Sequence, residues 1–511
     1  MNFKKQISVA ALALALSSAA NAAEFIVKVK DGFALPASAT KLVKVLDTHA
    51  TGNLIKISVD DKNTKEAIAS LYKNSDVQYV VPNFKLHRFE APLNTEALKE
   101  QWAIKKVRAE EAWAKAGNKG SRKVLVAVID TGVDYNHESL KDNSVPGYDY
   151  RNNDSDPMDE TSSQNPGHGT HCAGIIGATG LKDGGIVGIS PEVSLMPLRF
   201  LGSDGSGDLM NGVKAIDYAI EKKVDVISAS WGATVSRSQA KPLLEAIKRA
   251  DDAGVIFVAA AANDGKSNDR TEVYPANSGY PNTITVAASG SKDEKPSWSN
   301  YGKKSVHVAA PGLEIMSTLP SNKYGNLSGT SMATPLVSGL VALLKAQDGK
   351  LTGAAARSLL QTTGAKVSIE TACDCRVDAL TSVEAVLAKK MLVVPAAGTL
   401  APNDTLTVSA YNGTAPFTFE SSAPAVATID ANGLLKAVAA GDTTVTVTDA
   451  AGQKASSIGL RVAAGGGGGT DPGNPGDPGE PGLDKCPFEG EQAALCEIIC
   501  QIQPDLPFCQ K

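Results

Sequence analysis

The sequence predicts an α/β domain with a mostly parallel sheet and helices on both faces, preceded by a small α+β unit and followed by a β-sandwich. In the middle of the chain, short uninterrupted apolar runs alternate with helical segments, a pattern typical of a parallel sheet buried on both faces. Ahead of this region, alternating apolar and polar residues flank one helical segment. Behind it, short alternating strands follow one another without a helix.

Residues 1–22 are predicted to be a signal peptide. Two lysines near Met1 precede an apolar run over residues 7–16, and the tripeptide Ala20-Asn21-Ala22 follows. That run is too short to span a bilayer, and the small residues are typical of a secretory cleavage site. We expect cleavage after Ala22 or Ala23 and a secreted protein, free or attached to the cell surface, with no transmembrane segment.

Residues 23–90 form the small α+β unit. The runs EFIVKVK and LIKISV alternate like half-buried strands, NTKEAIASLYKN has helical spacing, and DVQYVV is typical of another strand. An adaptor domain would show the same pattern. The position between a signal peptide and a large α/β region favours a propeptide.

Residues 91–388 hold the α/β domain. Its apolar runs are KVLVAVID, VSLMPLRF, VDVISAS, VIFVAAAA, TITVAAS and VHVAAP, and the segments DLMNGVKAIDYAIEKK and PLLEAIKRADDAG between them are helical. Sites in such sheets lie at the carboxyl ends of the strands. Asp130 stands at one of these ends.

The C-terminal part divides into three segments. Residues 391–463 are predicted to form a β-sandwich of about immunoglobulin size. Residues 464–485 are a Gly/Pro linker, with a flexible start that stiffens toward polyproline II. Residues 486–511 are a cysteine-rich tail, expected to be a small helical hairpin with two disulfides.

The charge and the cysteines limit the partners. A net charge of -5 gives no general attraction to nucleic acid. The chain has seven cysteines, and export favours disulfides among the last four, whereas Cys172 is the best candidate for a free thiol. The pairing of Cys373 and Cys375 stays open, because a bridge across one residue would be strained.

Ser331 opens a segment that is uncharged up to Lys345, which predicts a helix buried on nearly every face. Pro335 is expected in its first turn, where a missing N–H costs nothing. The hydroxyl of Ser331 would then lie beside free backbone N–H groups, a natural anion site. For Ser331 alone, an ordinary helix cap is the favoured explanation.

Two further residues complete a constellation for acyl transfer, which needs a nucleophile, a base and a carboxylate that orients the base. Asp130 ends the run VLVAVID, and His168 lies in NPGHGTHCAG. Taken singly, Asp130 could be a buried cap and His168 a core histidine. Gly167 and Gly169, however, let backbone or substrate approach the imidazole closely.

These three blocks, in the order Asp, His, Ser, resemble the subtilases, the subtilisin-like serine peptidases, over about residues 101–387. The resemblance implies that Asp130 orients the imidazole, His168 is the general base and Ser331 the nucleophile. It also implies that Asn263, in FVAAAANDG, is an oxyanion-hole donor. Protein or peptide substrates would bind as an extended strand along Ser230-Trp231-Gly232.

Two departures from the family pattern bear on specificity. Val273 stands where relatives often carry a smaller residue, which suggests a shallow pocket for the side chain before the cut bond (P1). Asp264 suggests a preference for a basic P1 residue.

One acidic loop resembles a calcium site of thermostable subtilases. The matching residues are Asp149, Asn152, Asp154 and Asp156, although Met158 replaces an oxygen ligand there. Clustered hard oxygens suit a structural calcium ion. A solvated acidic loop without an ion is the alternative.

The resemblance extends to the flanking regions. The segment 23–90 resembles the family's inhibitory propeptide, with self-cleavage by Ser331 expected between Arg88 and Gln101. The run VATIDANGLLKAVAAGDTTVTVT resembles bacterial immunoglobulin-like domains, for which surface binding and a spacer role both remain open. We expect a monomer.

Two other functions were weighed against a peptidase. A catalytically dead adhesion protein would not need all four site residues. A serine esterase would carry a G-x-S-x-G motif, which the chain lacks.

Overall fold

The structure is a computed structural model, and it describes residues 22–33, 35, 37–89, 101–180, 186–463, 486–488, 494–502 and 507–509. The chain divides into two compact units, one of Met1–Pro82 with Phe488–Gln510 and one of Asn83–Pro487 with Lys511. The predicted signal peptide, apart from Ala22, and the predicted linker lie outside the described residues. No helix in the described ranges is long and apolar enough to cross a membrane.

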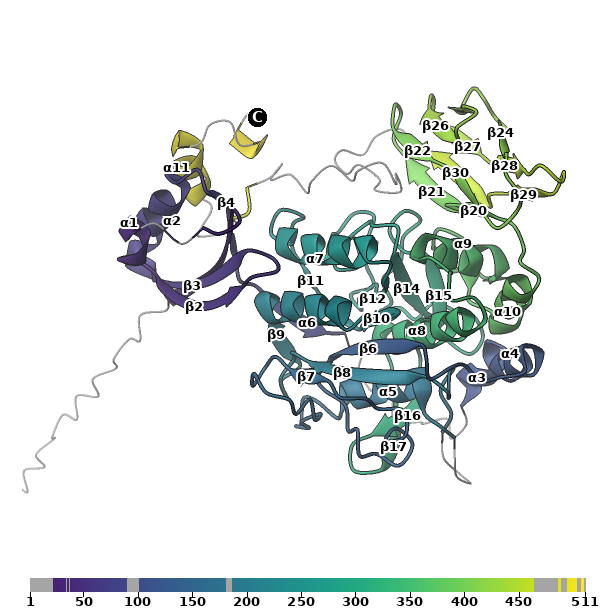
Figure 1. The fold of residues 1–511 in the computed structure, drawn as a ribbon, viewed down its shortest axis with the longest axis horizontal. Helices are drawn as coiled ribbons and strands as arrows, with labels where there is room; N and C mark the ends of the chain where they lie inside the picture. The colour runs from purple at the N-terminus through teal and green to yellow at the C-terminus, as the bar shows by residue number, and fades with distance from the viewer. Residues whose placement is uncertain are drawn as a thin grey trace, which may run out of the picture. The chain divides into compact units, whose positions relative to one another are not determined.

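The N-terminal unit is a four-stranded antiparallel sheet with helices, as the alternating runs predict (Figure 1). Its strands, in the order β2-β3-β1-β4, are β1 (Ala22–Val29), β2 (Lys44–His49), β3 (Leu54–Asp60) and β4 (Val77–Pro82). The helices are α1 (Ala37–Thr40), the 3-10 turn η1 (Asp61–Asn63) and α2 (Thr64–Tyr72). Ile68 and Leu71 of α2 are fully buried, which anchors the helix.

Most of the cysteine-rich tail, Phe488–Gln510, belongs to the same compact unit. It contains α11 (Ala494–Ile502) and the 3-10 turn η3 (Pro507–Cys509). Cys500 and Cys509 form a disulfide, and Cys486 and Cys496 are disulfide-bonded as well. The expected disulfides of the tail are therefore confirmed.

The central domain is built on a nine-stranded sheet with the order β18-β19-β15-β14-β12-β10-β6-β8-β7. Its six inner strands run parallel, as the apolar runs predict: β6 (Leu125–Asp130), β8 (Ser194–Arg199), β10 (Val226–Ala229), β12 (Ile256–Ala260), β14 (Thr283–Ser289) and β15 (Val308–Pro311). Short strands close the edges: β7 (Tyr148–Asp149), β18 (Ala365–Lys366) and β19 (Cys375–Arg376). Only the pair β18–β19 within this sheet is antiparallel.

Helices cover both faces of this sheet (Figure 1). On one face lie α6 (Leu209–Glu221) and α7 (Lys241–Asp252), and on the other α5 (His168–Gly177) and α8 (Thr330–Gln347). Around them pack α3 (Trp102–Lys106), α4 (Ala109–Ala116), α9 (Gly353–Thr363) and α10 (Ala379–Leu387). The fold class expected from the sequence is confirmed.

Helix α8 is buried from Thr330 to Leu344, as its uncharged sequence predicts. The expected position of Pro335 was wrong, because the helix starts at Thr330 and Pro335 lies inside it, beyond the first turn. Without an N–H, Pro335 leaves the carbonyl oxygen of Ser331 without its helical donor. The Ser230 hydroxyl replaces that donor at 2.9 Å, and the Cys172 thiol lies 3.4 Å away.

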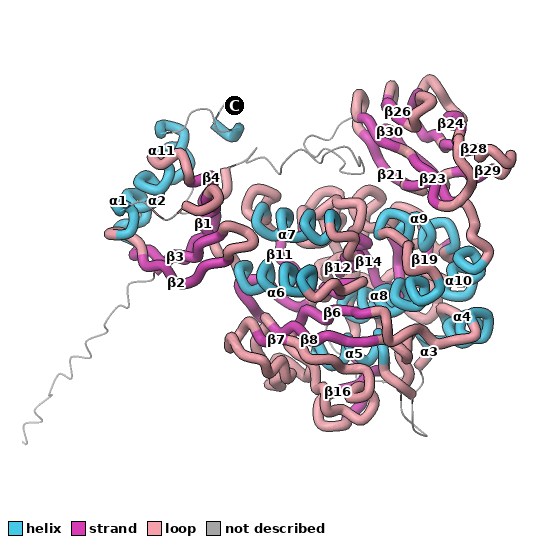
Figure 2. Tube along the Cα trace, viewed as in Figure 1, coloured by secondary structure: helices cyan, strands magenta, loops and turns pink. Residues whose placement is uncertain are grey.

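The C-terminal β domain contains only strands and turns among its described residues (Figure 2). The strands are β20 (Leu392–Val394), β21 (Ala397–Leu400), β22 (Thr405–Thr407), β23 (Ser409–Tyr411), β24 (Thr418–Ser421), β25 (Ala427–Ile429), β26 (Leu434–Ala437), β27 (Gly441–Thr443), β28 (Val445–Thr448), β29 (Lys454–Ser456) and β30 (Gly459–Val462). They form four small sheets around one apolar core that includes Leu406, Leu435, Val447 and Leu460.

Of the three remaining cysteines, two form a disulfide and one is a free thiol. Cys373 and Cys375 are disulfide-bonded, which settles the pairing that the sequence left open. Cys172 is a buried free thiol, as expected.

Candidate active site

Asp130 and His168 meet at the carboxyl end of the sheet. Asp130 is the last residue of β6, His168 is the first of α5, and His168 Nδ1 lies 2.7 Å from Asp130 Oδ1. Both side chains are buried, and His168 Nε2 has no hydrogen-bond partner among the described residues. The imidazole is therefore held at one nitrogen and left open at the other.

Glycine makes this approach of strand and helix possible. A Cβ on Gly169 would lie 2.1 Å from the carbonyl oxygen of Gly132 and 3.1 Å from Asp130 Cβ. A Cβ on Gly167, where φ is +110°, would lie 2.1 Å from Pro320. The glycines on both sides of His168 thus let other segments of the protein pack closely against this strand and helix junction.

Asp159 ties the loop after Asp130 to the start of α5, a role that the sequence did not reveal. Its carboxylate accepts hydrogen bonds from the hydroxyls of Thr131 (2.9 Å) and Thr170 (2.7 Å), from the Thr170 amide (2.9 Å) and from the Asn165 side chain (3.1 Å). Burial raises the pKa of Asp159, although these donors oppose the shift. In the sequence, Asp159 follows the other acids of the loop that begins at Asp149, and no local pattern marks its different role.

Ser331 lies beside this pair at the start of α8. Its hydroxyl donates to the carbonyl oxygen of Ser230 at 2.9 Å, and its side chain is fully buried. Ser230 directly follows β10, so the strands β6 and β10, which are neighbours in the sheet, deliver Asp130 and Ser230 to the same edge.

Asn263 follows β12, the next strand of the sheet, and its side-chain amide is oriented by Thr330. Asn263 Oδ1 accepts from the Thr330 amide at 3.0 Å and from the Thr330 hydroxyl at 2.9 Å. Asn263 Nδ2 is buried and has no partner among the described residues. A buried donor without a partner is costly, so it marks a place for an acceptor that arrives with a ligand.

One segment of the chain already lies in the cleft next to these residues. Strand β5 (Lys85–Arg88) runs antiparallel between β11 (Trp231–Thr234) and β9 (Ser206–Asp208), with β13 (Val273–Tyr274) beyond β11. The next residue, Phe89, donates its amide to Ser230 at 3.2 Å. The predicted substrate segment around Trp231 and Gly232 therefore does pair with an extended strand.

The carbonyl oxygen of Phe89, Asn263 Nδ2 and the Ser331 amide nitrogen all lie near Gly329. A Cβ built on Gly329 would be 2.8 Å from Phe89 O, 3.2 Å from Asn263 Nδ2 and 3.4 Å from the Ser331 amide nitrogen. All three groups thus surround one small volume that only a glycine leaves open.

The Phe89 side chain packs against Ala262, Val273 and Ala276. A Cβ on Gly232 would lie 2.8 Å from the Phe89 ring. This pocket accepts an aromatic ring beside Val273, so the shallow pocket expected from Val273 is not supported. Asp264 is exposed, and the Trp231 indole points into the core, where it donates to Ile129 O at 2.7 Å.

In the acidic loop, both carboxylate oxygens of Asp149 already have partners within the protein. Asp149 Oδ1 accepts from the amides of Arg151 (2.6 Å) and Asn152 (3.1 Å), and Asp149 Oδ2 pairs with the buried Arg199 at 2.9 Å. Burial raises the Asp149 pKa, and these contacts oppose the shift.

The side chains of the other acids in this loop accept hydrogen bonds from an amide and a hydroxyl elsewhere. Asp154 accepts from the Asp156 amide at 2.8 Å, and Asp156 accepts from Tyr135 at 2.8 Å. Within the described ranges, the only acid, His and Cys cluster with converging ligand atoms is Asp130, His168 and Cys172. Arg199 supplies a positive charge beside Asp149, and a calcium ion held by Asp149, Asn152, Asp154 and Asp156 stays a prediction.

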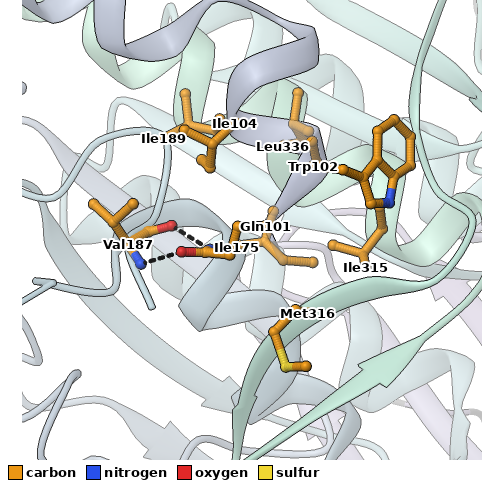
Figure 3. Close-up of a pocket in the computed structure, with 10 residues that line it drawn as sticks. Gln101, Trp102, Ile104, Ile175, Val187, Ile189, Ile315, Met316 and Leu336 are labelled. Atoms are coloured by element: carbon orange, nitrogen blue, oxygen red, sulfur yellow. Dashed lines mark hydrogen bonds between the residues drawn. The ribbon is translucent and has the colours of Figure 1, made fainter. Parts of the chain in front are cut away.

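A small pocket elsewhere in the central domain is structural (Figure 3). Its walls are mainly apolar, and it has room for about one water molecule. The Gln101 side chain makes two 2.8 Å hydrogen bonds to the backbone of Val187 there. These contacts anchor the start of the central domain.

Comparison with known proteins agrees with this geometry. The subtilase family profile matches residues 121–379, and a bacterial Ig-like domain (group 2) profile matches residues 388–458. The major intracellular serine protease of Bacillus subtilis (strain 168) is 43% identical over 246 residues, which is 48% of this chain and 75% of that protein.

Two further relatives are similar to this chain over about half of its length or more. Thermitase of Thermoactinomyces vulgaris is 40% identical over 268 residues, 52% of this chain and 89% of that protein. The thermophilic serine proteinase of Bacillus sp. (strain AK1) is 38% identical over 295 residues, 58% of this chain and 69% of that protein. The chain belongs to the subtilase family and is a subtilisin-like serine peptidase with a bacterial Ig-like domain.

Proposed function

We propose that the protein is a secreted serine endopeptidase, made as a precursor that cuts itself after Phe89. The observation that supports this proposal is that the Phe89 carbonyl oxygen, Asn263 Nδ2 and the Ser331 amide nitrogen would lie 2.8, 3.2 and 3.4 Å from one point, a Cβ built on Gly329. A peptide bond is cut where its carbonyl oxygen meets the oxyanion donors. The sequence placed the cut between Arg88 and Gln101, and Phe89–Glu90 lies within that interval.

In this mechanism Ser331 Oγ attacks the carbonyl carbon while its proton passes to His168 Nε2, the nitrogen left open by the Asp130 contact. The charge on the oxygen is stabilised by Asn263 Nδ2 and the Ser331 amide. The protonated imidazole then gives its proton to the leaving amine, and water hydrolyses the acyl-enzyme. Asp130 favours the charged imidazole throughout.

The neighbouring Cys172 is not the nucleophile. Burial raises its thiol pKa well above the ordinary value, and the charge on Asp130 adds to the shift. A thiol that stays protonated is a poor nucleophile. Its contact to the Ser331 carbonyl is structural, in agreement with the loss of the helical donor at Pro335.

The segment 23–90 acts as the propeptide in this proposal. Because β5 fills the cleft between β9 and β11, substrates cannot pair with these strands until β5 leaves. Export through the signal peptide 1–22, and a monomeric enzyme, complete the proposal. A structural calcium ion at Asp149, Asn152, Asp154 and Asp156 stays a prediction.

Intact mass spectrometry of the secreted protein tests self-processing. We expect wild-type enzyme to begin at Glu90, whereas Ser331→Ala purified alone keeps residues 23–89. Added active enzyme should then cut the Ser331→Ala precursor at the same bond. A Ser331→Ala chain that matures alone would refute self-processing.

A further inference from the structure

The tail and the N-terminal unit come from opposite ends of the chain, yet Phe488–Gln510 and Met1–Pro82 form one compact unit. The tail thus has a partner inside the segment that the proposed self-cleavage detaches. This relationship is independent of the active-site geometry.

An aromatic pair joins the two ends. The rings of Phe25 and Phe488 lie edge to face, with centroids 6.1 Å apart and an interplanar angle of 63°. Phe25 is fully buried in the central strand β1, and Phe488 is 2% exposed. Edge-to-face aromatic pairs add to the stabilisation from burial.

Helix α11 contributes the second contact, since it packs against α2. Leu495 and Ile499 lie one turn apart on the same face of α11 and are 3% and 0% exposed. Ala494 and Glu497 lie on the exposed side. The buried face of α11 is therefore apolar, and the helix beside it is α2.

Neither part is expected to be robust without the other. A helix of nine residues is marginal by itself in water, even with the Cys500–Cys509 disulfide that ties its end to η3. The N-terminal unit is also small for an independent hydrophobic core. Contact between α2 and α11 stabilises both.

We propose that the tail is a binding module for the protein's own propeptide and holds it on the enzyme after the cut behind Phe89. Retention of the cut propeptide by the tail rests on the proposed self-processing. The contact between the tail and the propeptide does not. After cleavage, the fragment ending at Phe89 keeps two attachments, β5 in the cleft and α2 on α11. Two linked attachments exceed either alone by about 10²–10⁴ in affinity. Enzyme activity should therefore appear later than the cut itself.

Hydrogen–deuterium exchange on the uncut full-length Ser331→Ala precursor tests the contact. We compare it with precursors that also carry Ile499→Asp or Glu497→Gln, which are matched changes on the buried and exposed sides of α11. Amides of α2 should exchange about tenfold faster or more with Ile499→Asp and be unchanged with Glu497→Gln. Ile499→Ala, a milder change, should fall between. Equal exchange in all four proteins would overturn the proposal.

The active enzyme tests retention. After self-cleavage, a tag following Lys511 should recover the propeptide fragment together with wild-type and Glu497→Gln enzyme. The Ile499→Asp enzyme should lose the fragment about tenfold faster or more and gain activity earlier. Equal retention in the three enzymes would overturn the retention part. An enzyme that never cuts itself would instead contradict self-processing, while the exchange experiment still reports on the contact.

Discussion

Thr330 fixes the carboxamide of Asn263 by two hydrogen bonds to Asn263 Oδ1, one from its amide and one from its hydroxyl. Because the carboxamide is planar, holding its oxygen also fixes the position of Nδ2, and a Cβ on Gly329 would lie 3.2 Å from Nδ2 and 2.8 Å from the Phe89 carbonyl oxygen. The other donor is the amide of Ser331, the next residue. One helix start therefore positions both oxyanion donors.

Replacing Asn263 removes one of these donors. We expect Asn263→Leu to lower kcat by about 10²–10³, a size known from the subtilisin family itself rather than derived from this geometry. KM should change little, because the donor acts on the charge that develops in the transition state. Steady-state kinetics on a peptide substrate measure both constants. A loss confined to KM would contradict the assigned role.

Thr330 should act through Asn263. We expect Thr330→Val to lower kcat by about tenfold, since one hydrogen bond of roughly 1–1.5 kcal/mol no longer orients the carboxamide. Thr330→Ser keeps the hydroxyl and should stay near wild type. The same kinetic assay applies, and in an Asn263→Leu background Thr330→Val should have little further effect. Full additivity of the two changes would show that Thr330 acts separately.

The sequence predicted the parts of the site that follow local patterns. Asp130 ends an apolar strand and His168 is flanked by glycines, so chain order and spacing were sufficient. The position of Phe89 depends on pairing between β5, β9 and β11, which are far apart in sequence. The role of Asp159 depends on four donors from three residues, Thr131, Asn165 and Thr170. Such non-local contacts leave no periodic signal.

In the acidic loop, too, a non-local contact could not be predicted from the sequence. Its sequence resembles a calcium site, but Arg199, the residue that pairs with Asp149, lies in another strand. A motif within one loop cannot reveal a positive charge that arrives from β8. The spacing could therefore point to the acidic loop but not to the partner of Asp149 outside it.

Arg199 is therefore expected to be essential for this loop. Its guanidinium also pairs with Glu160 at 2.7 Å, so Arg199→Met leaves a buried carboxylate without its partner. We expect a loss of about 3–5 kcal/mol in the free energy of unfolding, measured by denaturant titration in the Ser331→Ala background.

Chelation tests the calcium interpretation directly. Thermal midpoints in calcium and in EDTA should differ by the same amount in Ser331→Ala and in Ser331→Ala with Asp154→Asn and Asp156→Asn. A calcium-dependent shift in the thermal midpoint that disappears with these two substitutions would show that this loop binds calcium.

His171 should make stability sensitive to acid. Burial is the main cause that lowers its pKa from 6.5 to about 3, although a hydrogen bond to Gly325 opposes the shift. Between these pH values the unfolded chain binds a proton that the native protein does not. Its contribution is therefore complete above pH 6.5 and is lost as the pH falls toward 3, by at most about 1.4 kcal/mol per unit.

The measurement compares Ser331→Ala with Ser331→Ala/His171→Gln, because glutamine can still donate to Gly325. Between pH 7 and 4.5 the free energy of unfolding should fall more steeply with histidine, by up to about 2.5 kcal/mol in total. Parallel curves would show that His171 does not titrate in this range.

The Phe89 pocket predicts specificity for an aromatic residue before the cut bond. Phe89→Asp would place a carboxylate against Ala262, Val273 and Ala276, and losing the burial of the ring alone costs about 1.5–3 kcal/mol. We expect self-cleavage to slow by about 10- to 150-fold or more, whereas Phe89→Tyr stays near wild type. The time course of precursor processing measures this, and a peptide library on mature enzyme should show the same preference. Fast cutting of Phe89→Asp would contradict this specificity, and a preference of the mature enzyme for basic residues would instead favour a role for Asp264.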